Sequence, residues 1–184
     1  MHADVAIHRF HDLAATPELI AGIDAVFFDA SNTTSFESDA HRRTFRERWL
    51  GRYLQHDGAW AYVALDAKGA VAGYLVASLD DPATTPRFSD IAYFADFKNL
   101  TKLYPAHFHV NLAREYRGSG LGARLIGHIA GDARAAGAPG IHVVTSRGAR
   151  NTGFYQRNGF HEAGATGAGA REVVFLARKI GPGA

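Results

Sequence analysis

The 184-residue chain contains no cysteine, one methionine and two tryptophans. The lack of cysteine excludes disulfide bonds, thiolate nucleophiles and zinc sites built on thiolates. Long apolar runs are also missing, because Asp, Arg or His interrupts each stretch every few residues, so no membrane-spanning helix is predicted. There is little excess of either charge: 20 Lys and Arg stand against 18 Asp and Glu. So small a net charge gives no reason to expect a nucleic-acid or membrane partner.

What the chain does contain is enough apolar sequence for a core. Apolar residues make up 47% of it and aromatic residues 11%, as in an ordinary globular domain. The first ten residues alternate apolar and polar side chains and lack the apolar stretch of a signal peptide. We therefore expect a cytoplasmic protein with a single domain over residues 1–184. A long insertion at about residues 80–105, with three prolines and five aromatic residues, interrupts the regular pattern.

Hydrophobic periodicity predicts the order of the elements. Alternation over 3–10 predicts a strand, Thr16-Pro17 starts a helix, and Ser38-Asp39 starts a second helix that continues through Tyr53. The arginines of this second helix (Arg42, Arg43, Arg46 and Arg48) are predicted to form mainly a solvated face, with contact to an acidic partner as the alternative. Further elements follow in this order: a hairpin of strands 59–65 and 70–79, a short helix within 96–103, a strand at 107–112, a helix at 120–136, a strand at 141–145, a short helix at 152–158 and a strand at 172–179. This order predicts an α/β (mixed α+β) fold.

A glycine-rich turn joins the strand at 107–112 to the helix that follows. It contains Arg117, Gly118, Ser119, Gly120 and Gly122. In such a turn, successive main-chain N–H groups and the unpaired N–H groups of the helix start form a cradle for an anion. Glycines let phosphate oxygens approach the backbone, and Arg117 or Arg124 would add positive charge. The structural alternative is that the glycines only form a tight strand-to-helix corner.

The same glycines leave open which phosphate-bearing ligand binds. Gly118-x-Gly120-x-x-Ala123 matches the loose dinucleotide fingerprint, so an NADP-dependent oxidoreductase is one alternative. That fold needs several further strand–helix units, and only about sixty residues follow the motif. A Walker loop is excluded because its Gly-Lys-Ser/Thr ending is missing. Ser119 also lacks the flanking glycines of a nucleophile elbow.

Two motifs carry a resemblance to a known family. Arg117-x-x-Gly120-x-Gly122 resembles the signature of the GCN5-related N-acetyltransferase (GNAT) family, and Asn151–Phe160 (NTGFYQRNGF) resembles that family's second hallmark, a short helix with an aromatic-Tyr pair before Gly-Phe. Within the family, residues 103–112 (LYPAHFHVNL) are similar to bacterial acetyltransferases related to the C-terminal acetyltransferase-like domain of O-GlcNAcases. The resemblance implies a mostly antiparallel mixed sheet with helices on both faces and a central parallel strand pair that splays apart.

The resemblance also implies an activity and its residues. It implies acetyl-CoA-dependent N-acetyl transfer to a primary amine by direct attack, with Tyr155 as the general acid for the departing thiolate. The diphosphate of coenzyme A would bind the turn, and the pantetheine arm would pair with the strand before it. The implied coenzyme-binding residues are Val110, Asn111, Leu112, Arg117, Gly118, Ser119, Gly120, Leu121, Gly122, Ala123, Asn151, Phe154 and Tyr155.

The candidates for the general base are two histidines. His107 and His109 share one face of their strand by alternation, and imidazole titrates near neutral pH. In relatives with a strand-borne base, that base stands at the positions of Ala106 and Phe108 here, one step out of phase with the histidines. A β-bulge would restore the phase. Packed or exposed histidines, or the lack of any dedicated base, are the alternatives.

The expected partners are acetyl-CoA and an amine-bearing small molecule or a protein lysine, with the chain as a monomer or homodimer. No metal is expected, because His107, His109 and His142 have no carboxylate or cysteine to complete a ligand set. The alternative from another functional class is a non-catalytic acyl-CoA-binding module, a pseudo-acetyltransferase that keeps the cradle but transfers nothing. The out-of-phase histidines motivate that alternative.

Overall fold

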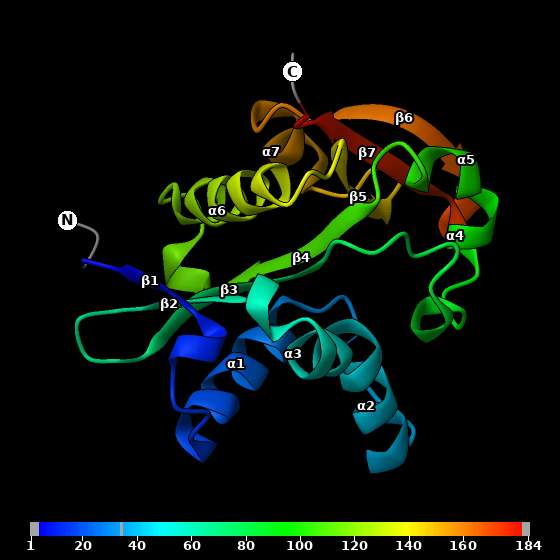
Figure 1. Cartoon of the computed structure of the whole chain (residues 1–184). Coiled ribbons are helices and arrows are strands. Elements are labelled where there is room, and N and C mark those ends of the chain that lie inside the picture. Colours follow the sequence, from blue (N-terminus) through cyan, green and yellow to red (C-terminus); the bar gives the residue numbers. More distant parts are fainter. Residues whose placement is uncertain (1–3, 34, 182–184) are drawn as a thin grey trace. The chain divides into compact units, whose positions relative to one another are not determined.

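The computed structural model describes residues 4–33 and 35–181 and forms one seven-stranded sheet in the order β1-β2-β3-β4-β5-β7-β6 (Figure 1). Strands β4 (Ala106–Leu112) and β5 (Gly140–Ser146) are parallel, with Ala106 opposite Ile141 and His107 opposite His142. The pairs β1–β2, β2–β3, β5–β7 and β6–β7 are antiparallel. The predicted mixed, mostly antiparallel sheet with a parallel pair is therefore confirmed.

The chain divides into two compact units, each made of two segments. The first unit comprises residues 1–77 and 109–128, and the second comprises residues 78–108 and 129–184. Strand β4 and helix α6 (Leu121–Ala135) each contribute residues to both units. Among the described residues, no helix has the length and apolar character needed to cross a membrane.

The first unit packs three helices against the start of the sheet. It contains β1 (Ala6–Arg9), α1 (Pro17–Ala30), α2 (Asp39–Arg46), α3 (Arg52–His56), β2 (Tyr62–Leu65) and all but the last residue of β3 (Val71–Ser78). Figure 1 shows α1, α2 and α3 on one side of these strands. Both predicted helix starts are confirmed by their caps: Leu19 N donates to Thr16 Oγ1 at 3.2 Å, and His41 N donates to Ser38 Oγ at 3.1 Å.

A π-helical segment, Glu47–Gly51, lies between α2 and α3. The periodicity predicted one regular helix here, and that prediction was wrong over these five residues. The carboxylate end of the exposed Glu47 side chain lies against Gly51, which is buried at the end of the segment. The segment leaves Trp49 half-buried, while Leu50 and Tyr53 are fully buried. Segments of this kind are frequent at functional sites.

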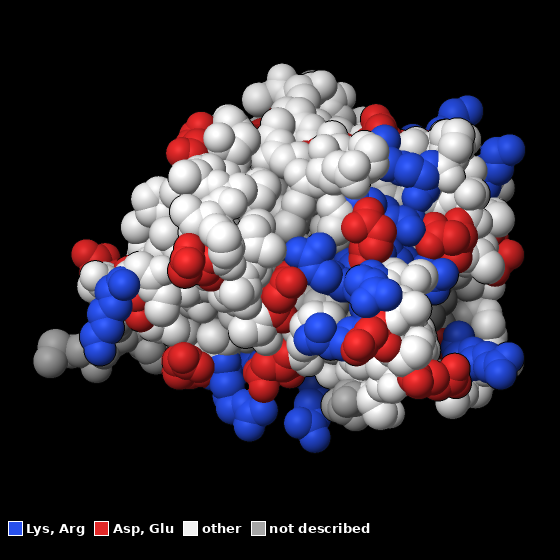
Figure 2. Space-filling model, turned by 90° about the horizontal axis from the view of Figure 1, so that it is seen from below, with Lys and Arg blue, Asp and Glu red and all other residues white. Residues whose placement is uncertain are grey.

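Two of the four arginines expected on a solvated face have partners within the first unit. Arg46 binds the Asp24 carboxylate, with Nη2 to Oδ1 at 2.8 Å, and the guanidinium of Arg42 lies 3.6 Å from the centre of the Phe28 ring. Figure 2 shows acidic side chains among the basic ones on the side viewed there. Arg42 and Arg43 are exposed, as a mainly solvated face predicts, whereas Arg46 and Arg48 are half-buried.

The second unit is built around β5 and β7 (Val173–Lys179), which pair from Gly140↔Lys179 to Ser146↔Val173. It also contains α4 (Tyr93–Asp96), α5 (Lys98–Thr101), α7 (Thr152–Arg157) and β6 (His161–Thr166). Buried Phe97, Tyr104 and Phe175 pack together in its core. The sequence predicted one helix within 96–103 and no strand at 161–166. Small residues and Gly164 give β6 little strand propensity, which explains why it was missed.

Short 3₁₀ turns complete the chain at Phe10–Asp12, Gly58–Trp60, Pro86–Phe88, Arg114–Tyr116 and Gly169–Arg171. The first predicted strand begins at residue 3, which lies outside the described residues, and β1 begins at Ala6. The turn at 58–60 occupies the start of the strand predicted over 59–65, so β2 is shorter than expected.

Two glycines test how tightly the first unit is packed. Gly127 is exposed in the middle of α6 and a Cβ there meets nothing within 4 Å, whereas a Cβ on Gly73 of β3 would lie 2.9 Å from Asn111 O and 2.5 Å from Leu112 Cδ2. Gly127→Ala should raise the free energy of unfolding by about 0.5–1 kcal/mol. Gly73→Ala should lower it by about 1–3 kcal/mol. Urea denaturation measures both, and equal effects would contradict the close approach of β3 and β4.

Candidate functional site

The glycine-rich turn leads from the end of β4 into α6. Gly118 and Gly120 have φ angles of +80° and +84°, a region that suits glycine. The Ser119 hydroxyl closes the turn by donating to Tyr116 O at 2.7 Å, and it accepts from Leu121 N at 3.4 Å. A Cβ on either glycine would meet nothing within 4 Å. The backbone is therefore open to an incoming group at both positions.

The start of α6 leaves a row of main-chain donors unused. The first helical bond runs from Arg124 N to Gly120 O at 3.2 Å. Within the described part of the chain, four N–H groups before it donate no hydrogen bond, those of Gly118, Gly120, Gly122 and Ala123. The N-terminus of a 15-residue helix also carries a partial positive charge. Such a row of donors beside open glycines suits the oxygens of a diphosphate.

The arginines expected to add charge bind protein acceptors instead. Arg117 donates from Nε to Leu112 O at 3.1 Å and pairs through Nη2 with Asp29 Oδ2 at 2.8 Å. Arg124 donates from Nη2 to Val5 O at 3.0 Å. Both guanidinium groups therefore hold the backbone of the first unit in place, and the unused donors of the turn are main-chain amides.

A tyrosine ties the same turn to the hairpin between β2 and β3. Tyr116 donates its hydroxyl to Asp66 Oδ2 at 3.1 Å. Asp66 Oδ1 also accepts from the backbone N–H groups of Ala70 and Lys68, both at 2.9 Å. The bond from Ala70 is the largest of the effects that lower the pKa of Asp66. The carboxylate therefore stays charged, and remains an acceptor for Tyr116, into mild acid.

Asn111 and His109 of β4 both contact tyrosine hydroxyls of the first unit. Asn111 Nδ2 donates to the Tyr74 hydroxyl at 2.6 Å. His109 Nε2 lies 3.2 Å from the Tyr53 hydroxyl, and its ring meets Trp49 and Tyr53 edge-on. Desolvation, and then the charge of Arg52, lower the pKa of His109 to about 4. The imidazole is therefore neutral at neutral pH and accepts hydrogen bonds, but it is a weak base.

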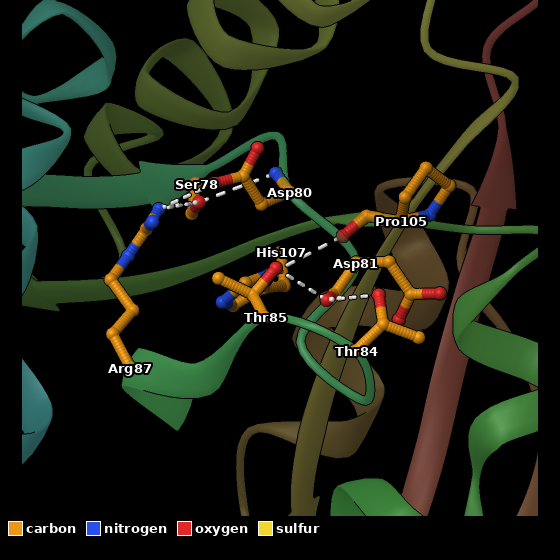
Figure 3. Close-up of polar contacts among 8 residues, drawn as sticks. All are labelled: Ser78, Asp80, Asp81, Thr84, Thr85, Arg87, Pro105 and His107. Atoms are coloured by element: carbon orange, nitrogen blue, oxygen red, sulfur yellow. Dashed lines mark hydrogen bonds and ion pairs between the residues drawn. The ribbon is translucent and has the colours of Figure 1, made fainter. Parts of the chain in front are cut away.

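His107 lies in the core of the second unit. It is 3% exposed, and its ring contacts Phe88 and Phe94 at 4.8 and 5.6 Å between centroids. It stacks on His142, the residue opposite it in the sheet, at 5.4 Å. Nδ1 lies 3.3 Å from Pro105 O (Figure 3). These surroundings favour a packed histidine over a catalytic one.

The insertion at 80–105 is held by polar contacts where it leaves β3. Arg87 Nη2 donates to Ser78 Oγ at 2.9 Å and pairs with Asp80 Oδ2 at the same distance (Figure 3). Ser78 is fully buried, and its hydroxyl oxygen also accepts from Asp80 N at 3.3 Å. Thr85 Oγ1 donates to Asp81 O at 2.8 Å. The beginning of the insertion is thus an ordered turn with its own hydrogen bonds.

Tyr155 occupies the middle of α7 and is 4% exposed. Its ring packs edge-on against Phe108 of β4 and against Phe160, at 6.1 and 5.9 Å between centroids. Burial raises the pKa of the hydroxyl above its ordinary value, so the group keeps its proton at neutral pH. Within the described residues this hydroxyl makes no hydrogen bond. Over residues 4–33 and 35–181 it is therefore a proton donor without a protein acceptor.

The other two residues implied in this motif flank Tyr155. Asn151 lies just before α7 and is exposed, and its Oδ1 accepts from Thr145 Oγ1 at 3.0 Å. Phe154 is half-buried and contacts the Tyr155 ring at 5.2 Å. Over residues 4–33 and 35–181, no three His, Asp or Glu side chains come together as a metal site would require.

Comparison with known proteins adds a family and a fold. The acetyltransferase (GNAT) family model matches residues 25–160. The crystal structure of SsHAT superposes with a TM-score of 0.73 at 18% identity, covering 96% of this chain and 98% of that one. An N-acetyltransferase from Staphylococcus aureus Mu50 gives 0.64 at 14% identity, covering 97% and 99%. The NatC complex bound to Gag peptide and CoA gives 0.63 at 13% identity, covering 96% and 98%. At these identities the three structures show a shared fold.

The low pKa of His109 predicts a loss of stability in acid. In the folded chain the pKa of His109 is about 4, which is below the ordinary pKa of 6.5. Below pH 6.5 the unfolded chain therefore binds a proton that the folded chain does not. This contribution is complete above pH 6.5 and is lost as pH falls toward 4. Between pH 7 and pH 5, the free energy of unfolding should therefore fall by about 2 kcal/mol less in His109→Gln than in the wild type.

Urea denaturation at the two pH values measures this difference. His56→Gln, at the exposed end of α3, is the matched control and should follow the wild type. A His109→Gln variant with the wild-type pH dependence would show that desolvation does not set the pKa of this imidazole.

Proposed function

The chain belongs to the acetyltransferase (GNAT) family, and on this premise we propose that it is an acetyl-CoA-dependent N-acetyltransferase that moves an acetyl group to a primary amine by direct attack. The observation that carries the proposal is the row of unused main-chain donors in the turn before α6, next to two glycines with open space in front of them. This geometry fits the diphosphate of coenzyme A. Acetyl-CoA, when bound, supplies an activated thioester.

We assign the residues of the turn, Arg117 to Ala123, to binding the diphosphate through their backbone. The main chain of Val110–Leu112 is assigned to the pantetheine arm, with the N–H near Leu112 as the donor to the carbonyl oxygen that gains charge. Asn111 fits this assignment because its side-chain amide donates to Tyr74, so its orientation is fixed. Arg117 supports the turn through the hydrogen bond that its Nε donates to Leu112 O.

We assign Tyr155 to protonating the thiolate that leaves. Its neutral hydroxyl, held by Phe108 and Phe160, suits a general acid. His109 is neutral and accepts hydrogen bonds, so we assign it to orienting the acceptor amine or a water rather than to strong base catalysis. The acceptor class in this proposal remains an amine-bearing small molecule or a protein lysine. A cytoplasmic location and the narrower likeness to O-GlcNAcase-related acetyltransferases remain predictions.

A second candidate function is a non-catalytic acyl-CoA-binding module. The observation that favours it is the state of the two histidines, since His107 is buried among aromatic rings and desolvation makes His109 a weak base. A thiol-release assay with acetyl-CoA and a panel of amines separates the two candidates. Release that depends on an added amine supports the transferase, whereas tight binding of acetyl-CoA without such release supports the module.

Gly120→Glu tests the place of the diphosphate. The carboxylate would occupy the open space in front of the turn and repel the phosphates, so binding of coenzyme A should be lost by titration calorimetry. Gly137→Glu is the matched control, because Gly137, two residues after the end of α6, has the same φ of +84° and also has open space around it. Both variants carry the same backbone strain. Equal loss of binding in the two would contradict the assignment.

Tyr155→Phe tests the proton donor. Removal of a hydroxyl that makes no protein hydrogen bond should leave the melting temperature nearly unchanged. The turnover number should fall by about 10²-fold or more, the usual contribution of a positioned acid. Steady-state kinetics with the best acceptor of the panel measures the effect. An unchanged turnover number in a folded variant would remove Tyr155 from the mechanism.

A further inference from the structure

Both arginines of the turn between β4 and α6 meet one carboxylate on α1. Arg114 Nη2 lies 3.0 Å from Asp29 Oδ1, and Arg117 Nη2 lies 2.8 Å from Asp29 Oδ2. Arg117 also donates through Nε to Leu112 O, the last carbonyl of β4. Asp29 therefore uses its two oxygens to join the end of a helix to both sides of a 3₁₀ turn. All three side chains are exposed.

The position of Asp29 in α1 suggests that its ion pairs with Arg114 and Arg117 do more than stabilise the fold. Asp29 is the penultimate residue of α1, and the last turn of α1 contains no basic residue. A negative charge is unfavourable at that end of a helix, where the carbonyl groups already carry partial negative charge. The two guanidinium groups of the turn offset this cost. Exposed ion pairs add little to global stability, about 0–1 kcal/mol, but these two connect α1 to the turn that carries the unused main-chain donors.

We propose that Asp29 is a positioning residue for the coenzyme, acting through Arg117 on the main-chain donors of Gly118, Gly120, Gly122 and Ala123. This inference rests on the proposed function. Asp29 also engages both guanidinium groups and offsets half of their charge, so that the amides of the turn are the donors left for the diphosphate. Holding Arg117 fixes the entry to the turn at Leu112 O and therefore the direction of the N–H groups that follow.

The same helix provides a matched control. Asp24 of α1 also makes an ion pair at 2.8 Å, with the less exposed Arg46, and no contact with the turn among the residues described. Asp24→Asn and Asp29→Asn thus remove one carboxylate charge each from α1 and break one cluster of charge-assisted hydrogen bonds each. Only Asp29→Asn removes the connection to the coenzyme turn.

Titration calorimetry with coenzyme A tests the proposal on the full chain. Asp29→Asn should raise the Kd for coenzyme A by about fivefold, the upper end of what an exposed ion pair contributes, and Asp24→Asn should leave it within about twofold. The KM for acetyl-CoA should rise in the same proportion as the Kd, with kcat nearly unchanged. Arg117→Gln should weaken binding to the same extent. The double variant Asp29→Asn with Arg117→Gln should be no weaker than Arg117→Gln alone, because the two residues act as one unit.

Three outcomes would overturn the proposal: an Asp29→Asn variant that binds coenzyme A as tightly as the wild type or more tightly, effects of Asp29→Asn and Arg117→Gln that add, or equal losses in Asp29→Asn and Asp24→Asn. Thermal unfolding of each variant checks the fold, and Arg117→Gln, which keeps the charge of Asp29, serves if Asp29→Asn does not fold. If the wild-type protein binds coenzyme A but releases no thiol, the proposed catalysis is overturned. The Kd values of the variants then still decide the role of Asp29. Wild-type protein that binds no coenzyme A would overturn both.

Discussion

The candidate site depends on hydrogen-bond donors that a helix start cannot satisfy within itself. An α-helix always leaves its first N–H groups without helical acceptors. Most helices pair these groups with a capping side chain, as α1 and α2 do with Thr16 and Ser38. Helix α6 is different, because Ser119 turns its hydroxyl proton back to Tyr116 O and caps only weakly through Leu121 N. Donors that no side chain uses remain free for an anion from outside.

Much of the fold and the position of this turn follow from the sequence, because local chemistry determines them. Positive φ at Gly118 and Gly120, the caps of α1 and α2, and the short helix around Tyr155 all depend on residues close together along the chain. The family motif also depends on local spacing. Its two parts therefore led to the family that the comparisons identify for residues 25–160.

Other features depend on contacts between distant residues and could not be predicted. Arg117 looked like a phosphate ligand because its partner Asp29 stands 88 residues away. His107 and His109 share a strand face, yet one packs among Phe88, Phe94 and His142 and the other beside Trp49 and Tyr53. Alternation predicts the face of a side chain but not the residues that cover it. Strand β6 was missed because pairing with β7 overrides its weak intrinsic preference.

The π-helical segment at Glu47–Gly51 has a consequence for how this protein tolerates changes in length. A regular helix turns the chain by about 100° per residue, and a π-helical turn accommodates about one residue more. Loss of one residue from the widened turn would therefore restore a regular helix and leave the residues after it on the same face, with the Tyr53 hydroxyl still beside His109 Nε2. In relatives of this chain, a one-residue gap at this place would therefore leave the surroundings of His109, and so its acidity, unchanged.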